Sequence, residues 1–317
     1  MQTPLRIVSS SLVEDPSTQR HQAADAIRAA LEETGCFVLL VEGADSAIDA
    51  ATRQWRRFYA QPDTVKQRCQ ADRDEGGGWL RLRDEPVYMS HLSSAELDAP
   101  RCKEQFVCGP DEQAGPWPNE QAFPGFRRDV GGCAQVLSRA AQALLGSFEA
   151  LLGQEPGFLR YEPGHLTLTS YPGSARSVAE GTVALHEHSD AVVFTLLRQT
   201  VEALQVKTIQ GDWLRVPLLD DSSFLVIPGD WMELFTNGLI PAARHRVLEL
   251  AADREAVAFF QNVAAMRVGP LDEFLREDEE PRYPSVNSAI PYSTGDAGVP
   301  RWRAHIEAQS SEPPSNQ

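Results

Sequence analysis

The amino-acid sequence predicts a mainly β protein with flanking helices, in which the β part is a jelly roll. The main observation is a run of short β-rich segments between residues 165 and 262, separated by the turn residues Pro-Gly, Gly-Asp, Asp-Asp and Asn-Gly. Roughly eight such segments at near-regular spacing are typical of a sandwich or barrel, and the jelly roll is the natural closed form. The second observation is that the helical patterns lie mainly before this run.

The predicted strands of the jelly roll are short and turn-bounded. In order, they are HLTLTSYP, GTVALHEH, AVVFTLL, EALQVKTI, DWLRVPL, SSFLVIP, DWMELFT, ARHRVLEL and EAVAFFQN. Upstream, residues 5–11 indicate an edge strand, and residues 36–41, CFVLLV, indicate a strand buried on both sides. Apolar residues at intervals of three and four predict helices over residues 15–35, 45–59 and 129–152.

Residues 70–128 show no clear periodicity of apolar residues. The stretch DEGGGWLRLRDEPVYMSHL indicates a surface loop or a segment that covers the substrate, since long loops in compact domains are often lids. Near the C-terminus, PLDEFLRED predicts a short helix and AQSSEPPSNQ a disordered tail. We therefore divide one structural unit into an N-terminal region (1–128), a long helix with the catalytic core (129–268) and a C-terminal region (269–317).

Composition excludes several classes of partner. With 29 basic and 45 acidic residues the net charge is −16, which repels phosphate backbones, so we expect no nucleic-acid partner. No apolar run approaches the roughly 20 residues of a membrane span, and the N-terminus lacks a run of signal-peptide length. The five cysteines fit no zinc spacing, so free thiols are expected. These features predict a cytoplasmic protein without membrane contact.

The segment ALHEHSD, residues 184–190, carries the first candidate metal ligands. His188 and Asp190 are two apart, so on a strand both side chains face the same way and can reach one ion. His186 shares that parity, which makes His186 with His188 a rival pair. A cupin-type His-x-His site also needs a nearby glutamate and a histidine after a downstream glycine. Neither follows here.

A third ligand must come from another strand. His245, in ARHRVLEL, lies on a late predicted strand, at a separation suited to two strands that line one barrel mouth. Two histidines and one carboxylate on one face of an octahedron leave three positions open, which suits non-haem Fe(II) and oxygen chemistry. His188, Asp190 and His245 are therefore the predicted iron ligands. His186 is then either a packed strand histidine or a neighbour of the substrate pocket.

Short motifs follow one another along nearly the whole chain: ALEETGCFVLL, FYAQPDTVKQR, KEQFVCG, LTSYPG, HSDAVVFTLL, GDWLRVP, PGDWMELFTNG and HRV. HSDAVVFTLL is close to the pattern H-T-D-x-x-x-L-T-L-L, and LTSYPG is similar to N-x-Y-P. In this order and spacing, the motifs resemble the isopenicillin N synthase-like family of Fe(II)/2-oxoglutarate oxygenases. The resemblance implies a double-stranded β-helix, another name for the jelly roll, with helices packed on its outside.

The resemblance also implies an activity and a co-substrate site. Such an enzyme uses Fe(II), 2-oxoglutarate and O2 to oxidise a C–H bond of a small molecule, such as an amino acid or a specialised metabolite. Hydroxylation is the default result, and desaturation and ring formation remain open. Arg254, in DREAVAFF, matches the arginine that holds the distal carboxylate of 2-oxoglutarate by two hydrogen bonds, and Tyr171 would donate a third.

Two positions depart from the family pattern, because Ala256 replaces a serine and Thr169 an asparagine. One lost neutral hydrogen bond weakens binding by about 1 kcal/mol. Ala256 therefore leaves a second function open, an iron oxidase of the isopenicillin N synthase type that uses no 2-oxoglutarate. In that case Arg254 holds the carboxylate of the substrate. A third alternative is a non-catalytic jelly roll that only binds ligands.

Candidate substrate contacts come from three parts of the chain. Arg81, Arg83 and Tyr88, in the glycine-rich loop, are candidates to bind a carboxylate of the substrate. The remaining candidates for the pocket lining are His186, Phe194 and Phe260, on predicted strands, and for the two phenylalanines packing in the core is the favoured alternative.

Overall fold

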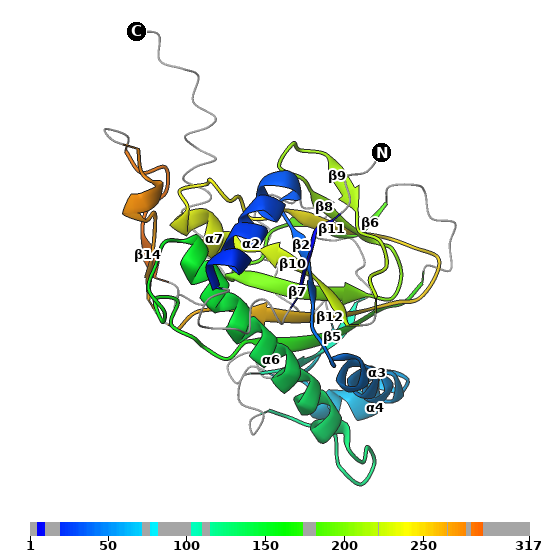
Figure 1. The fold of residues 1–317 in the computed structure, drawn as a ribbon. Coiled ribbons are helices and arrows are strands. Elements are labelled where there is room, and N and C mark those ends of the chain that lie inside the picture. The colour runs from blue at the N-terminus through cyan, green and yellow to red at the C-terminus, as the bar shows by residue number, and fades with distance from the viewer. Residues whose placement is uncertain are drawn as a thin grey trace.

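In the computed structural model, two β-sheets form a jelly roll, and helices cover one face of the larger sheet (Figure 1). The structure describes residues 5–9, 20–71, 77–81, 103–109, 115–173, 182–220, 222–264, 266–276 and 280–287. The successive strands β5 to β12 make up the jelly roll. Four of them, β5, β7, β10 and β12, belong to the larger sheet and four, β6, β8, β9 and β11, to the smaller one.

The larger sheet has eight strands within the described residues. Their order is β1 (Ile7–Ser9), β2 (Phe37–Leu40), β10 (Ser223–Pro228), β7 (Phe194–Gln199), β12 (Arg254–Gln261), β5 (His165–Tyr171), β4 (Glu104–Cys108) and β3 (Gly78–Arg81). The smaller sheet has the order β6 (Val183–His188), β11 (His245–Leu248), β8 (Leu204–Lys207) and β9 (Trp213–Arg215). A separate two-stranded sheet pairs β13 (Arg267–Val268) with β14 (Val286–Asn287).

The helices pack against the outer face of the larger sheet. They are α2 (Arg20–Thr34), α3 (Asp45–Tyr59), α4 (Asp63–Lys66) and α6 (Phe126–Leu151), and α2 lies alongside α6 (Figure 1). Alternate strand residues such as Leu168, Phe194 and Val257 meet them in one apolar core. The next residue along each strand points the other way, because side chains alternate across a sheet. That inner face looks toward the smaller sheet and carries the candidate site.

Most predicted elements are confirmed. The edge strand in residues 5–11 is β1, which pairs with β2, and CFVLLV contains the buried β2. The helix over 45–59 has the predicted bounds, and α6 begins at Phe126 instead of residue 129, directly after Gly125. Of the helix predicted over 15–35, residues from Arg20 onward are described and helical. The C-terminal tail lies outside the described residues.

Three predictions about the backbone were wrong. DWMELFT forms the helix α7 (Asp230–Phe235), not a strand; its apolar side chains are buried on several sides, so the segment lacks the one-sided period that identifies a helix. Within its described residues, 270–276, PLDEFLRED forms the 3-10 turn η3 (Asp272–Phe274) and no longer helix. Residues 70–128 also supply β3 and β4. These strands extend the larger sheet because β4 pairs with β5 and buries Phe106.

Candidate metal centre

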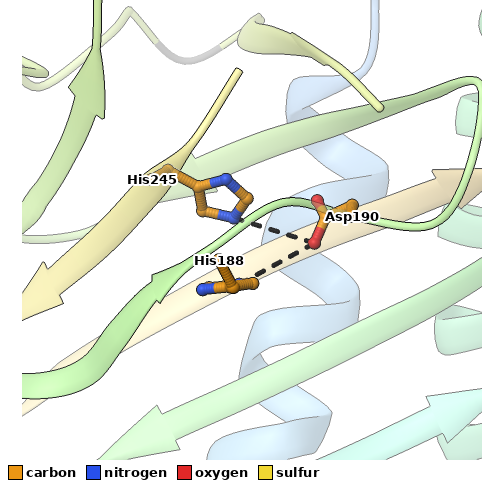
Figure 2. A group of neighbouring side chains, drawn as sticks. All are labelled: His188, Asp190 and His245. Carbon is orange, nitrogen blue, oxygen red and sulfur yellow. Dashed lines mark ion pairs between the residues drawn. The ribbon is translucent and has the colours of Figure 1, made fainter. Parts of the chain in front are cut away.

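The two candidate histidine ligands stand opposite each other on neighbouring strands. His188 is the last residue of β6 and His245 the first of β11, and the antiparallel register pairs them directly. Their ring centroids are 4.2 Å apart. Asp190 follows His188 by two residues, where the chain leaves β6 for β7 (Figure 2). The predicted triad therefore forms at the place where the chain crosses from the smaller sheet to the larger one.

The geometry of the triad fits a divalent metal ion. Asp190 Oδ1 lies 3.8 Å from His188 Nε2 and 3.7 Å from His245 Nε2, as the dashed lines of Figure 2 show. All three ligand atoms lie within 4.8 Å of one another. Metal–ligand bonds of about 2 Å place the ligands of one ion roughly 3–4 Å apart, so a small inward movement closes the set.

Hydrogen bonds orient two of the three ligands. Thr195, on β7, donates its hydroxyl to Asp190 Oδ2 at 2.6 Å, which leaves Oδ1 facing the histidines. His245 Nδ1 lies 3.1 Å from the carbonyl oxygen of Ala243 and donates to it, so Nε2 carries the lone pair. Burial alone would raise the pKa of Asp190. The nearby histidines and the Thr195 hydroxyl outweigh burial and hold that pKa below its usual value.

Arg254 is a buried guanidinium on the same inner face. It begins β12, directly opposite Tyr171 on β5, and its Cζ lies 4.3 Å from the centre of the tyrosine ring. Its side chain is almost fully buried, yet Nε and Nη1 have no hydrogen-bond partner among the described residues. Burial lowers the pKa of Arg254, and Tyr171 opposes that shift. Buried unpaired donors of this kind fit a carboxylate ligand.

The two departures from the family pattern lie next to Arg254. Ala256 is two residues further along β12 on the same face, and it pairs with Thr169 across the sheet. Both residues are buried. The alanine methyl group donates no hydrogen bond, so a carboxylate held by Arg254 lacks the hydroxyl that a serine would offer.

The candidate substrate residues have different outcomes. Phe260 lies on the inner face of β12, where it pairs with His165 and Thr195, and its role as a pocket residue stays a prediction. Phe194 lies on the outer face, where its ring stacks on Phe148 of α6 at 5.2 Å, so its predicted place in the pocket is wrong. Arg81 also points away from the inner face, because it bonds Asp63 and Glu104 outside it.

Three other candidates cannot be placed. Arg83 and Tyr88 lie outside the described residues. His186 belongs to β6, but its side chain lies outside what the structure describes.

His165 is a site residue that the sequence reasoning missed. It begins β5, pairs with Phe260 and stacks on that ring with centroids 4.8 Å apart. Burial lowers the pKa of His165 to about 4. Its partner Phe260 pairs with Thr195, which bonds Asp190, so His165 lies on the face of the sheet that carries the triad. The available signal was the period of two in HLTLTSY, which puts His165 on the face of Thr169 and Tyr171.

Comparisons with known proteins agree with this geometry. The family model of the 2OG-Fe(II) oxygenase superfamily matches residues 158–263, and a model described as the N-terminal part of non-haem dioxygenases in morphine synthesis matches residues 5–124. A 2-oxoglutarate-Fe(II) type oxidoreductase of Metarhizium rileyi is 30% identical over 54% of this chain and 53% of its own length. The chain thus spans about half of that relative.

Two other relatives match over most of their length. Isopenicillin N synthase of Hapsidospora chrysogena is 29% identical over 81% of this chain and 82% of its own. A 2-oxoglutarate-dependent dioxygenase of Aspergillus rugulosus is 25% identical over 89% of this chain and 94% of its own.

Solved structures share the fold. A protein of the 2OG-Fe(II) oxygenase family from Caulobacter crescentus superposes with a TM-score of 0.73 at 23% identity, covering 90% of this chain and 96% of its own. A full-length Neurospora crassa protein, solved in complex with alpha-KG, gives a TM-score of 0.72 at 22% identity, covering 95% and 96%. No helix in the described part of the chain is long and apolar enough to cross a membrane. The chain thus matches the 2OG-Fe(II) oxygenase superfamily over residues 158–263, the segment that contains His188, Asp190, His245 and Arg254.

Proposed function

We propose that the protein is an Fe(II)- and 2-oxoglutarate-dependent dioxygenase that oxidises a C–H bond of a small molecule, with hydroxylation as the default result. His188, Asp190 and His245 hold the iron, and Arg254 with Tyr171 holds the distal carboxylate of 2-oxoglutarate. The observation that carries the proposal is the pairing of a metal-ready triad with a buried arginine whose Nε and Nη1 lack partners among the described residues.

The chain's own residues position the reaction. Bound iron would supply open coordination positions for the co-substrate and O2, and the oxidising power for the C–H bond. Thr195 fixes which oxygen of Asp190 faces the metal, and the Ala243 carbonyl fixes the tautomer of His245. Arg254 orients 2-oxoglutarate from its far end. His165 and Phe260 together form an aromatic wall beside the triad.

An anaerobic titration tests the proposal. Fe(II)-loaded protein is titrated with 2-oxoglutarate while the weak metal-to-ligand charge-transfer band in the visible is recorded. The band should appear and saturate, because iron and 2-oxoglutarate share one site. The same titration of Asp190→Ala should give no band. Iron binding without a band in the wild-type protein would refute 2-oxoglutarate as co-substrate.

A second candidate is an iron oxidase of the isopenicillin N synthase type, which uses no 2-oxoglutarate. Ala256 favours it, because the carboxylate pocket lacks one donor, and a relative named isopenicillin N synthase matches over 82% of its length. Arg254 would then hold the carboxylate of the substrate itself. Succinate release on turnover separates the two candidates, since the oxidase forms product with iron and O2 but without succinate. The third alternative, a non-catalytic jelly roll, does not account for three ligand atoms that lie close enough to hold one ion.

We also infer that the substrate is a small molecule, that nucleic acid is not a partner and that the protein acts in the cytoplasm. The net charge of −16 disfavours nucleic acid. The free, buried cysteines Cys36, Cys69 and Cys133 suit a reducing compartment.

A further inference from the structure

The motif KEQFVC places two adjacent charges on opposite faces of the larger sheet. Glu104, the first residue of β4, bonds Lys66 at 2.7 Å and Arg81 at 3.0 Å on the outer side. Lys103 comes directly before Glu104, so in extended chain it shares the face of Gln105. Gln105 pairs with Thr169, which in turn pairs with Ala256, and this is the inner face. Lys103 therefore lies on the inner face, the side of the larger sheet that looks toward the smaller sheet.

The strand register places Lys103 level with the candidate co-substrate residues. Glu104 pairs with Ser170, so the next step of the same antiparallel register brings Lys103 opposite Tyr171. Tyr171 pairs with Arg254 on its other side. Neighbouring strands are about 4.8 Å apart, so the backbones of Lys103 and Arg254 lie roughly 10 Å apart, one on each side of Tyr171.

Lys103 is not neutralised by the described part of the chain. Its side chain is half-buried, and no described carboxylate lies within ion-pair distance of it. By contrast, Lys66 on the outer face bonds Glu104 and stands over the rings of Tyr59 and Trp79.

The charges of the inner face do not cancel when iron and co-substrate are bound. The two positive charges of Fe(II) cancel the two negative charges of 2-oxoglutarate. The remaining charges are the negative one of Asp190 and the positive ones of Lys103 and Arg254. One positive charge therefore remains among the described residues of the inner face. A buried or partly buried charge is costly unless an opposite charge pairs with it.

We propose that Lys103 binds a carboxylate of the prime substrate, so that the enzyme acts on an anionic small molecule. The inference rests on the proposed function, because Arg254 is assigned to 2-oxoglutarate there. A lysine ammonium is a compact charge on a flexible stem, able to reach an acid group whose position the triad dictates. Lys103 thus selects acids over their neutral analogues, while Arg254 serves the co-substrate.

Matched pairs of acids and amides test this assignment. Anaerobic protein loaded with Fe(II) and 2-oxoglutarate is titrated with l-proline, l-leucine and phenylacetate, each beside its carboxamide, and the shift of the charge-transfer band is recorded. At least one acid should shift the band, and its carboxamide should bind roughly tenfold or more weakly. Lys103→Met should abolish this preference without changing the 2-oxoglutarate titration, and Lys103→Arg should keep it.

Lys207→Met is the matched control. Lys207 lies on β8 of the smaller sheet and bonds Glu187 at 3.3 Å, so its loss should change neither titration. The inference is wrong if the amides bind as well as the acids, if no acid responds, or if Lys103→Met weakens 2-oxoglutarate itself. A wild-type protein without any band contradicts the proposed function instead. In that case, calorimetric titration of the Mn(II)-loaded protein with the same acids and carboxamides still measures whether Lys103 gives a preference for the acids.

Discussion

Arg254→Met should stabilise the ligand-free protein while it weakens 2-oxoglutarate binding. In the absence of ligand, Nε and Nη1 of Arg254 are buried without partners among the described residues. Buried unsatisfied groups cost about 1–3 kcal/mol each, and methionine fills a similar volume without that cost. The change also removes the contact of the guanidinium with the Tyr171 ring at 4.3 Å, which contributes about 0.5–2 kcal/mol. Two such groups cost about 2–6 kcal/mol together, so the balance favours methionine by roughly 1 kcal/mol or more.

The two effects have separate readouts. For a chain of this size, 1 kcal/mol corresponds to about 1–2 °C in Tm, which differential scanning calorimetry of the metal-free protein measures. Losing a bidentate charged contact of about 3 kcal/mol should raise the Kd for 2-oxoglutarate roughly a hundredfold in the anaerobic titration.

The control is Arg246→Met, because Arg246 stacks at 4.0 Å on Trp213 but donates to Gln205 at 2.8 Å. That variant should lose a little stability and keep its affinity for 2-oxoglutarate. An Arg254→Met protein that melts several degrees lower, or that binds 2-oxoglutarate normally, would refute the reasoning.

Three further outcomes are expected. Asp190→Ala should abolish turnover and Fe(II) binding, since it removes the only anionic ligand of the triad; near-normal activity would show that the metal assignment is wrong. Thr195→Val should weaken Co(II) binding roughly 10- to 100-fold in a spectroscopic titration, because Asp190 loses the 2.6 Å bond that orients it; unchanged affinity would contradict that role. Cys36 and Cys133, whose pKa values burial raises to about 12, should resist iodoacetamide at pH 8 in the native protein and react in urea, as peptide mass spectrometry can show. Rapid native labelling of either would indicate an open core.

Local patterns in the sequence determined much of the molecule. The apolar period of three and four located α3 and α6, and turn residues separated nearly all the jelly-roll strands. The parity of His188 and Asp190, with one late histidine, identified the triad that the structure brings together. These signals succeed because burial of one face imposes a fixed period on any helix or strand.

Tertiary structure decided features that the spacing of apolar residues along the sequence does not determine. DWMELFT has the apolar content of a strand, yet it folds as α7, and its burial on several sides removes the one-sided period that identifies a helix. Phe194 and Phe260 are both strand phenylalanines, but only the tertiary structure shows that one meets α6 and the other lies on the inner face.

The same holds for the charged residues. Arg81 and Lys103 are both basic residues of the N-terminal region, and only the pairing of β3, β4 and β5 separates an arginine held by two carboxylates from a lysine on the cavity face. The sequence alone determined which residue types and periods exist. The direction each side chain takes depends on pairing between strands far apart in the chain, because a shift of one residue in register sends every side chain to the opposite face.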